Sequence, residues 1–140
     1  MALDSTATAH WEGDLMSGGG TTTLTSGAGG PFPVDWKARS EEHAGKTSPE
    51  ELIAAAHATC FSMALSNGLG QAGTPPDYLD VTATATFVPG EGITAMRLVL
   101  SGEVPGLSDE QFREAAADAK ENCPVSQALA GNVPITLEIN

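Results

Sequence analysis

The sequence predicts an α+β fold, with mostly antiparallel sheets wrapped around a long central helix and a single domain over residues 1–140. Residues 79–88 alternate between polar and apolar side chains almost without exception, which is typical of a half-buried strand. The segment that follows Ser48 is rich in alanine and apolar on most sides, which is typical of a buried helix. Strand-like and helical segments follow one another in the order β-β-(β)-α-β-β-α-α-β, an arrangement that favours antiparallel pairing.

The first third of the chain predicts a β-hairpin. Residues 6–12 predict one strand, and the β-branched residues 21–25 predict a second. Gly18-Gly19-Gly20 is expected to form the turn near the start of the second strand. Residues 34–38 are expected to form a third short strand or an extended segment, followed by a polar loop at 41–46.

The central helix has the clearest start signal in the sequence. Ser48 suits the N-cap, Pro49 suits the first helical position, and Glu51 completes a capping box three residues after the cap. The helix should run to about Leu69, because Gly70 and later prolines oppose its continuation. A helix that is apolar nearly all round must be covered, either by sheet or by a partner chain.

A second hairpin follows the helix. Residues 79–88 and 93–103 predict its strands, with Pro89-Gly90 at the turn. Leu98 and Leu100 are expected to lie on one face, together with Met96. Residues 133–139 alternate as a closing strand, and a proline near its start predicts an edge position.

Two helices are expected between this hairpin and the closing strand. Ser108 and Gln111 have capping-box spacing, and the helix that they begin should end near Asn122. A short helix, residues 125–129, should follow, with Cys123 at its N-cap. Backbone amides at such a position stabilise a thiolate and lower its pKa.

Composition excludes several classes of function. The net charge of −12, with only six lysines and arginines, disfavours nucleic acid and anionic membrane as partners. The N-terminus does not resemble a signal peptide, and the apolar stretch 52–65 is too short to span a bilayer. We therefore expect a cytoplasmic protein, in which a disulfide between its two cysteines would be transient rather than structural.

The two cysteines are the residues best suited to chemistry. A thiolate attacks the O–O bond of a peroxide and becomes a sulfenic acid, which a second thiol converts to a disulfide. Cys60, in mid-helix, would need a cation to become a thiolate, and Arg39 is the best candidate because its charge persists when buried. Glu50 is free to orient Arg39. The simpler alternative is that both cysteines are small core residues.

His57 lies one turn before Cys60 on the same helix face. It is a candidate base or ligand, although a lone helical histidine is more often a hydrogen-bonded core residue. A zinc site formed by His57, Cys60 and Cys123 is a weaker possibility, because the sequence has no closely spaced pair of ligands.

Two motifs resemble a known family. Residues 47–65, around Cys60, resemble the signature helix of the osmotically inducible protein C and organic hydroperoxide resistance (OsmC/Ohr) family, and residues 122–126 resemble its second cysteine motif. The opening residues 10–13 and the last strand are also similar. No arginine precedes Arg39, so the pattern is that of the OsmC branch, in which the arginine lies just ahead of the signature helix.

The resemblance implies a peroxidase that reduces organic hydroperoxides, and hydrogen peroxide more weakly. It implies Cys60 as the peroxidatic residue, Cys123 as the resolving residue, and Arg39 with Glu50 as their support. It further implies an intertwined homodimer and no cofactor. An external dithiol, from a lipoyl-protein or a thioredoxin-like protein, would be the reductant.

The length of the central helix also favours a dimer, independently of the resemblance. Ten residues of helix span about 15 Å, so Glu50 and Cys60 of one chain cannot share a small site. If both act together, Glu50 must come from the partner subunit. The alternatives are a non-enzymatic redox sensor, a small-molecule or metal-binding module with structural cysteines, and a thiol-dependent hydrolase that uses His57 as base.

Overall fold

The structure is a computed structural model that describes residues 1–140, and its chain divides into two compact units, 1–52 and 53–140. Its elements confirm the predicted α+β class and, apart from one additional helix at Trp36–Ser40, the predicted element order. They are β1 (Ala7–Glu12), β2 (Gly19–Leu24), β3 (Phe32–Val34), α1 (Trp36–Ser40), α2 (Pro49–Gln71), β4 (Tyr78–Val88), β5 (Gly92–Glu103), α3 (Asp109–Asn122), α4 (Pro124–Leu129) and β6 (Ile135–Ile139).

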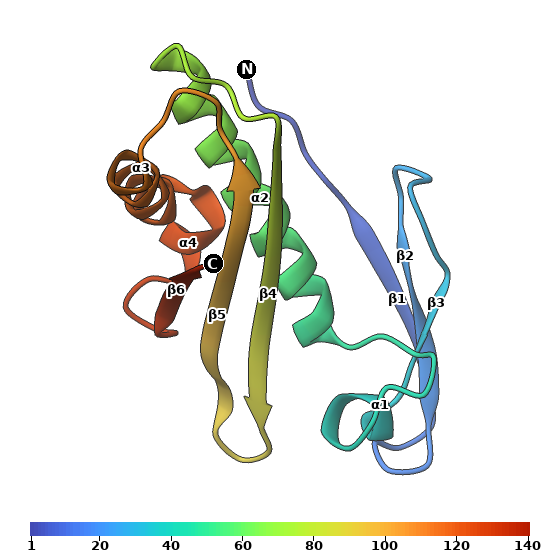
Figure 1. The fold of residues 1–140 in the computed structure, drawn as a ribbon. Helices are drawn as coiled ribbons and strands as arrows, with labels where there is room; N and C mark the ends of the chain where they lie inside the picture. The colour runs from blue at the N-terminus through green and yellow to red at the C-terminus, as the bar shows by residue number, and fades with distance from the viewer. The chain divides into compact units, whose positions relative to one another are not determined.

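The first unit holds a three-stranded antiparallel sheet in the order β1-β2-β3, with α1 after it (Figure 1). The predicted hairpin is confirmed, but the expected turn at residues 18–20 is wrong in part. Gly19 and Gly20 are paired with β1, and the chain turns before them. A side chain on Gly20 would collide with the carbonyl oxygen of His10 on the neighbouring strand. Glycine is therefore needed there for the close approach of two strands.

The segment before the central helix differs from the expectation. Residues 34–38 were expected to be extended, yet the third strand ends at Val34 and residues from Trp36 form the helix α1. Asp35 explains the change, because its carboxylate accepts a hydrogen bond of 2.7 Å from the backbone N–H of Ala38 and so caps the helix. Arg39 consequently projects from a helix rather than from an extended segment.

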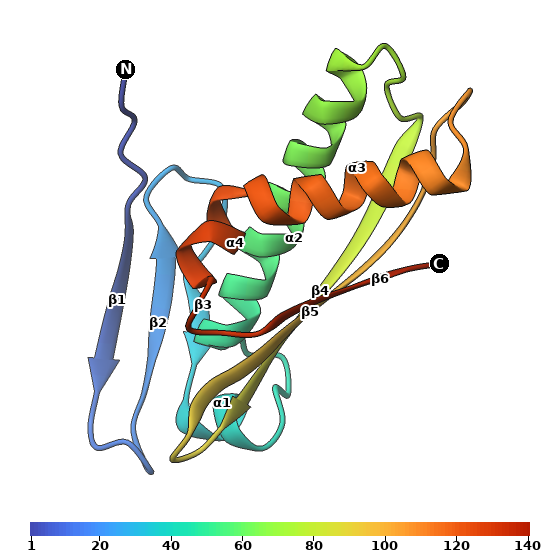
Figure 2. The same cartoon turned by 90° about the vertical axis from the view of Figure 1, so that its left-hand side faces the viewer.

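The second unit packs three helices on one face of the sheet β4-β5-β6, as Figure 2 shows. The strands β4 and β5 form the predicted antiparallel hairpin, whereas β6 pairs with β5 in parallel and lies at the edge. Met96, Leu98 and Leu100 of β5 have no exposed surface, as their spacing predicted. The capping box of α3 is also confirmed, with reciprocal bonds between Ser108 and Gln111.

The start of α2 confirms the Ser48 cap but not the full capping box. The hydroxyl of Ser48 accepts a hydrogen bond of 3.1 Å from the backbone N–H of Glu51. The Glu51 carboxylate, however, accepts 2.6 Å from the hydroxyl of Thr47 instead of returning to the cap. The Glu51 carboxylate was expected to accept a hydrogen bond from the backbone N–H of the cap residue. The hydroxyl of Thr47, one residue before the cap, donates to it instead.

One face of α2 forms the core of the second unit. Phe61, Leu65 and Leu69 are buried at intervals of one helical turn, and they pack against Leu98 and Leu100. By length and composition alone α2 would also suffice to span a membrane, with a mean hydropathy of 1.3. Its role in this core makes it the central helix of a soluble fold.

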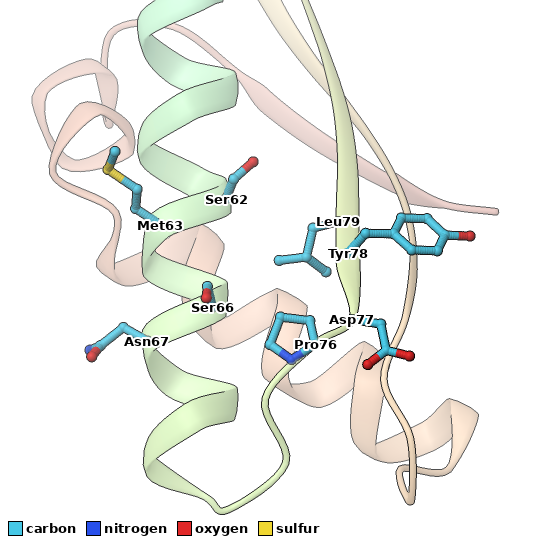
Figure 3. A pocket seen from close by; sticks show the side chains of 8 residues that line it. All are labelled: Ser62, Met63, Ser66, Asn67, Pro76, Asp77, Tyr78 and Leu79. Atoms are coloured by element: carbon cyan, nitrogen blue, oxygen red, sulfur yellow. The ribbon is translucent and has the colours of Figure 1, made fainter.

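The opposite face of α2 is open in the single chain. Exposed small and apolar residues recur along it every three or four positions: Ala55, Ala56, Thr59, Met63, Ser66 and Gly70. Beside it lies a groove of about 550 Å³ between α2 and the start of β4. Figure 3 shows that Leu79 points toward the helix across this groove while Tyr78 points away. One chain therefore covers only part of its most apolar helix.

Candidate functional site

Arg39 and Glu50, which the sequence only suggested as partners, form an ion pair in the first unit. The guanidinium Nε donates hydrogen bonds of 3.0 and 3.3 Å to the two carboxylate oxygens, and Nη2 donates one of 2.9 Å to Oε1. Glu50 is buried, with 5% of its surface exposed, whereas the Arg39 side chain is one-third exposed. Such a fork-like contact fixes the orientation of the guanidinium plane.

Arg39 borders a pocket of about 360 Å³ in the same unit. Its walls are mainly apolar, and the charged side chains among them are those of Asp35 and Arg39. The apolar wall comes from β1, the residues after it, β3, α1 and the start of α2: Ala9, Trp11, Leu15, Val34, Trp36, Pro49 and Leu52. A cation beside an apolar cavity suits a ligand with a polar head and a hydrocarbon chain.

Cys60 and Cys123 meet in the second unit as two free thiols. Cys60 lies in the middle of α2, half-buried, and packs against the core cluster that contains Cys123. Cys123 is fully buried where α3 ends and α4 begins. A hydrogen-bond contact with the other thiol shifts the pKa of each of them. Residues 63 positions apart in sequence are therefore near enough for direct exchange between their sulfurs.

The surroundings favour the thiolate at Cys123 rather than at Cys60. Burial raises the pKa of the Cys60 thiol, and the hydrogen bond that it donates to Cys123 raises that pKa further. Burial also opposes ionisation of Cys123, but hydrogen bonds outweigh it and lower the pKa of Cys123. The groups that stabilise its charge are the Cys60 thiol, the hydroxyl and backbone N–H of Ser126, and the backbone N–H of Val125. The first proton that this coupled pair loses is thus assigned to Cys123.

His57 and Ser126 form a buried pair beside the thiols. The imidazole Nε2 lies 2.7 Å from the Ser126 hydroxyl oxygen, and both side chains are almost or completely inaccessible to solvent. The other ring nitrogen of His57, Nδ1, has no hydrogen-bond partner. Burial lowers the pKa of His57, so the ring is neutral near pH 7.

Two apolar neighbours of Cys60 on α2 differ in exposure. Phe61 is fully buried in the core, and Met63 lies on the open face of α2. The structure contains no group of three His, Cys, Asp or Glu side chains that could hold a metal ion, and His57 is directed to Ser126. Ser126 was not predicted as a site residue. Its position three residues after Cys123, in the first turn of a short helix, could have indicated that it lies near that thiol.

The chain resembles known proteins over its whole length. The family described as OsmC-like protein matches residues 42–138. "Peroxiredoxin OsmC" of Escherichia coli is 40% identical over 99% of both chains, and "Organic hydroperoxide resistance protein OhrA" of Bacillus subtilis is 30% identical over 66% of this chain and 67% of that one. A crystal structure of an organic hydroperoxide resistance protein OsmC from Legionella pneumophila superimposes with a TM-score of 0.70 at 26% identity, covering 100% of this chain and 98% of that one. With two-thirds of its length matched by the family and a full-length relative at 40% identity, the chain belongs to the OsmC-like protein family.

Proposed function

We propose that this protein is a cysteine-based peroxidase that reduces organic hydroperoxides, with Cys60 as the attacking thiol and Cys123 as the resolving thiol. The observation that carries the proposal is the pair of free, hydrogen-bonded thiols in the core of an OsmC-like fold. The names of its relatives, a peroxiredoxin and organic hydroperoxide resistance proteins, support the same activity.

The proposed catalytic cycle has three steps. The Cys60 thiolate attacks the distal oxygen, the O–O bond breaks, and the alkoxide takes up a proton and leaves as an alcohol. The Cys123 thiolate then attacks the sulfur of the Cys60 sulfenic acid, which forms the disulfide and releases hydroxide that becomes water. An external dithiol reduces the disulfide by exchange and is itself oxidised. A lipoyl-protein and a thioredoxin-like protein are the candidate reductants, and the cytoplasm is the compartment that keeps such thiols reduced.

The site requires two subunits. Cys60 needs a nearby cation, because its surroundings in one chain raise its pKa. Glu50, which holds Arg39, lies on the same helix as Cys60 at a distance of ten residues, or about 15 Å. We therefore assign each of two equivalent sites the two cysteines of one chain and the Arg39–Glu50 pair of its partner.

The single chain leaves suitable surfaces uncovered. The open face of α2 carries small residues that permit close helix contact, with the large apolar side chain of Met63 67% exposed among them. All six residues of β1 are exposed, including its apolar face of Ala7, Ala9 and Trp11. An intertwined homodimer would bury both surfaces, and the Arg39 pocket would then accept the hydrocarbon part of an alkyl hydroperoxide.

Introducing a charge on the open face of α2 tests the dimer. We expect Met63→Glu to shift the protein from dimer to monomer and to lower peroxidase activity with it, because a carboxylate buried in an apolar interface lacks a partner. Ala117→Glu places the same charge on an exposed position of α3 and should leave a dimer. Sedimentation equilibrium over a range of protein concentrations measures both. A wild-type protein that is active as a monomer would exclude the two-subunit site.

Replacing the resolving thiol should separate the two sulfur steps. We expect Cys123→Ser to reduce one equivalent of hydroperoxide per chain and then to stop, because no second thiol can remove the sulfenic acid. Repeated exposure to peroxide should convert Cys60 to sulfinic and sulfonic acids, which mass spectrometry of the intact protein detects as additions of two and three oxygens. Multiple turnovers by this variant with a dithiol reductant would contradict the resolving role.

Stoichiometry tests the proposed function directly. One equivalent of cumene hydroperoxide should remove two thiols per chain and form a Cys60–Cys123 disulfide, faster than hydrogen peroxide does. A redox sensor would form the same disulfide once but would not be recycled efficiently by any dithiol. Thiols that persist in excess peroxide would favour the module with structural cysteines.

A further inference from the structure

His57 and its contact with Ser126 have no part in the proposed cycle. His57 has no exposed surface, yet only one of its two ring nitrogens has a hydrogen-bond partner. An unpaired polar atom in the interior carries a cost in folding free energy that an apolar side chain of similar size would avoid. A histidine that packed only as core would gain nothing from this arrangement.

The donors and acceptors of the cluster allow one consistent assignment. Cys123 is the N-cap of α4 and Ser126 lies in its first turn, so a Ser126 hydroxyl that donates its single proton to the Cys123 sulfur would favour the thiolate there. Its oxygen, 2.7 Å from Nε2 of His57, must then accept a proton from that nitrogen. The neutral His57 therefore carries its proton on Nε2, and Nδ1 keeps an unpartnered lone pair.

Few polar groups compete with this chain of hydrogen bonds. Of the titratable side chains of α2, Cys60 adjoins Cys123 and His57 contacts Ser126, while Lys120 and Glu121 of α3 line a surface pocket that also reaches Ser126. The remaining core contacts from α3 and β5 are apolar: Ala116, Ala119, Leu98 and Leu100. In such surroundings each hydrogen bond to a charged sulfur is stronger than it would be in water.

Building on the proposed function, we propose that His57 is a positioning residue that acts through the Ser126 hydroxyl to hold Cys123 as a hydrogen-bonded thiolate, ready to attack oxidised Cys60. In that step the Cys123 sulfur is oxidised, the sulfenic sulfur of Cys60 is reduced, the S–O bond breaks and the S–S bond forms. The departing hydroxide is neutralised by the proton that Cys123 lost earlier. His57 and Ser126 exchange no atoms with substrate.

The first test uses no peroxide. In a Cys60→Ser background, the ultraviolet absorbance of the Cys123 thiolate is measured against pH, which gives the midpoint of its ionisation without a reagent having to reach the buried sulfur. We expect His57→Leu and Ser126→Ala to raise that midpoint by about one pH unit, a tenfold loss of thiolate below the midpoint. His57→Gln and Ser126→Thr, which keep a donor and a hydroxyl respectively, should restore the midpoint to within about 0.3 pH unit.

The second test follows the disulfide-forming step in otherwise wild-type protein. After rapid mixing with cumene hydroperoxide, a dimedone probe traps any sulfenic acid that persists on Cys60. His57→Leu and Ser126→Ala should increase trapping by about tenfold, in proportion to the lost thiolate. Ser62→Ala is the matched control, because this half-buried hydroxyl of the same helix α2 bonds the backbone carbonyl of Ala58 at 2.7 Å.

The results distinguish a failure of the role proposed for His57 from a failure of the proposed peroxidase function on which it rests. An unchanged ionisation midpoint of Cys123 in both His57→Leu and Ser126→Ala overturns the inference, as does a failure of His57→Gln and Ser126→Thr to restore it. If His57→Leu does not fold, Ser126→Ala decides, since it removes a single oxygen atom. A wild-type protein that does not consume hydroperoxide refutes the proposed function, whereas normal consumption with an unmoved midpoint refutes only the role of His57.

Discussion

Replacing Cys60 with serine is expected to lower the rate of hydroperoxide reduction by at least about 10³-fold. A serine hydroxyl has nearly the same size as the thiol, but it is far less nucleophilic near neutral pH and cannot form a disulfide with Cys123. The variant should therefore fold, retain the Cys123 thiol, and fail at the first step. Stopped-flow measurement of thiol loss in a single turnover, with cumene hydroperoxide and with hydrogen peroxide, tests this.

The comparison with Cys123→Ser decides which sulfur attacks. Each variant removes one thiol, but only Cys60→Ser should lose the fast reaction with peroxide. This comparison is informative because the single chain favours the thiolate at Cys123. A fast reaction that survives in Cys60→Ser and disappears in Cys123→Ser would reverse the roles of the two residues. In that case the assignment of the partner subunit's Arg39 to the Cys60 thiolate would lose its basis.

Arg39→Ala is expected to lower the rate of the peroxide step by about 10²–10³-fold while leaving both thiols in place. The guanidinium is the cation assigned to the Cys60 thiolate across the subunit interface, and its loss removes charge stabilisation in a site with little water. The apparent pKa for thiolate formation, read from the pH dependence of the single-turnover rate, should rise in the variant. An unchanged pH profile would show that the cation acts elsewhere.

Arg97→Ala is the matched control for the loss of positive charge. Arg97 also pairs with a carboxylate, that of Glu138, but both side chains are about half exposed, so their pair contributes little to stability. We expect this variant to keep its peroxidase rate within about twofold. A similar loss of rate in both variants would indicate a general effect of net charge rather than a specific role for Arg39.

The Arg39→Ala variant is also expected to have a lower free energy of unfolding than the wild type. Arg39→Ala leaves the buried Glu50 carboxylate without its guanidinium, which should cost about 1–3 kcal/mol in the free energy of unfolding. Glu50→Gln in the same chain removes the stranded charge and should recover part of that loss without recovering activity. Urea unfolding followed by circular dichroism measures the recovery, and a double variant that regained activity would contradict the assigned role of Arg39.

The sequence predicted those elements in which local signals and tertiary packing agree. The alternation of residues 79–88 reappears in the burial of β4, and the capping box at Ser108 begins α3 as expected. Prediction from the sequence was wrong where two local signals compete. The glycines at 19 and 20 suggested a turn but allow two strands to approach closely, and Asp35 caps a helix where β-like residues suggested extension.

For the site, the sequence by itself determined the residue types and their spacing along the chain: a mid-helix cysteine, a second cysteine at a helix start, and an arginine and glutamate ahead of the first. Only the tertiary structure decided that Arg39 forms an ion pair with Glu50, that the two thiols meet, and that Ser126 links His57 to Cys123. The contacts between Arg39 and Glu50, between the two thiols, and between His57 and Ser126 join residues 11, 63 and 69 positions apart. Periodicity and capping describe neighbours within one element, whereas contacts between elements depend on how whole faces pack.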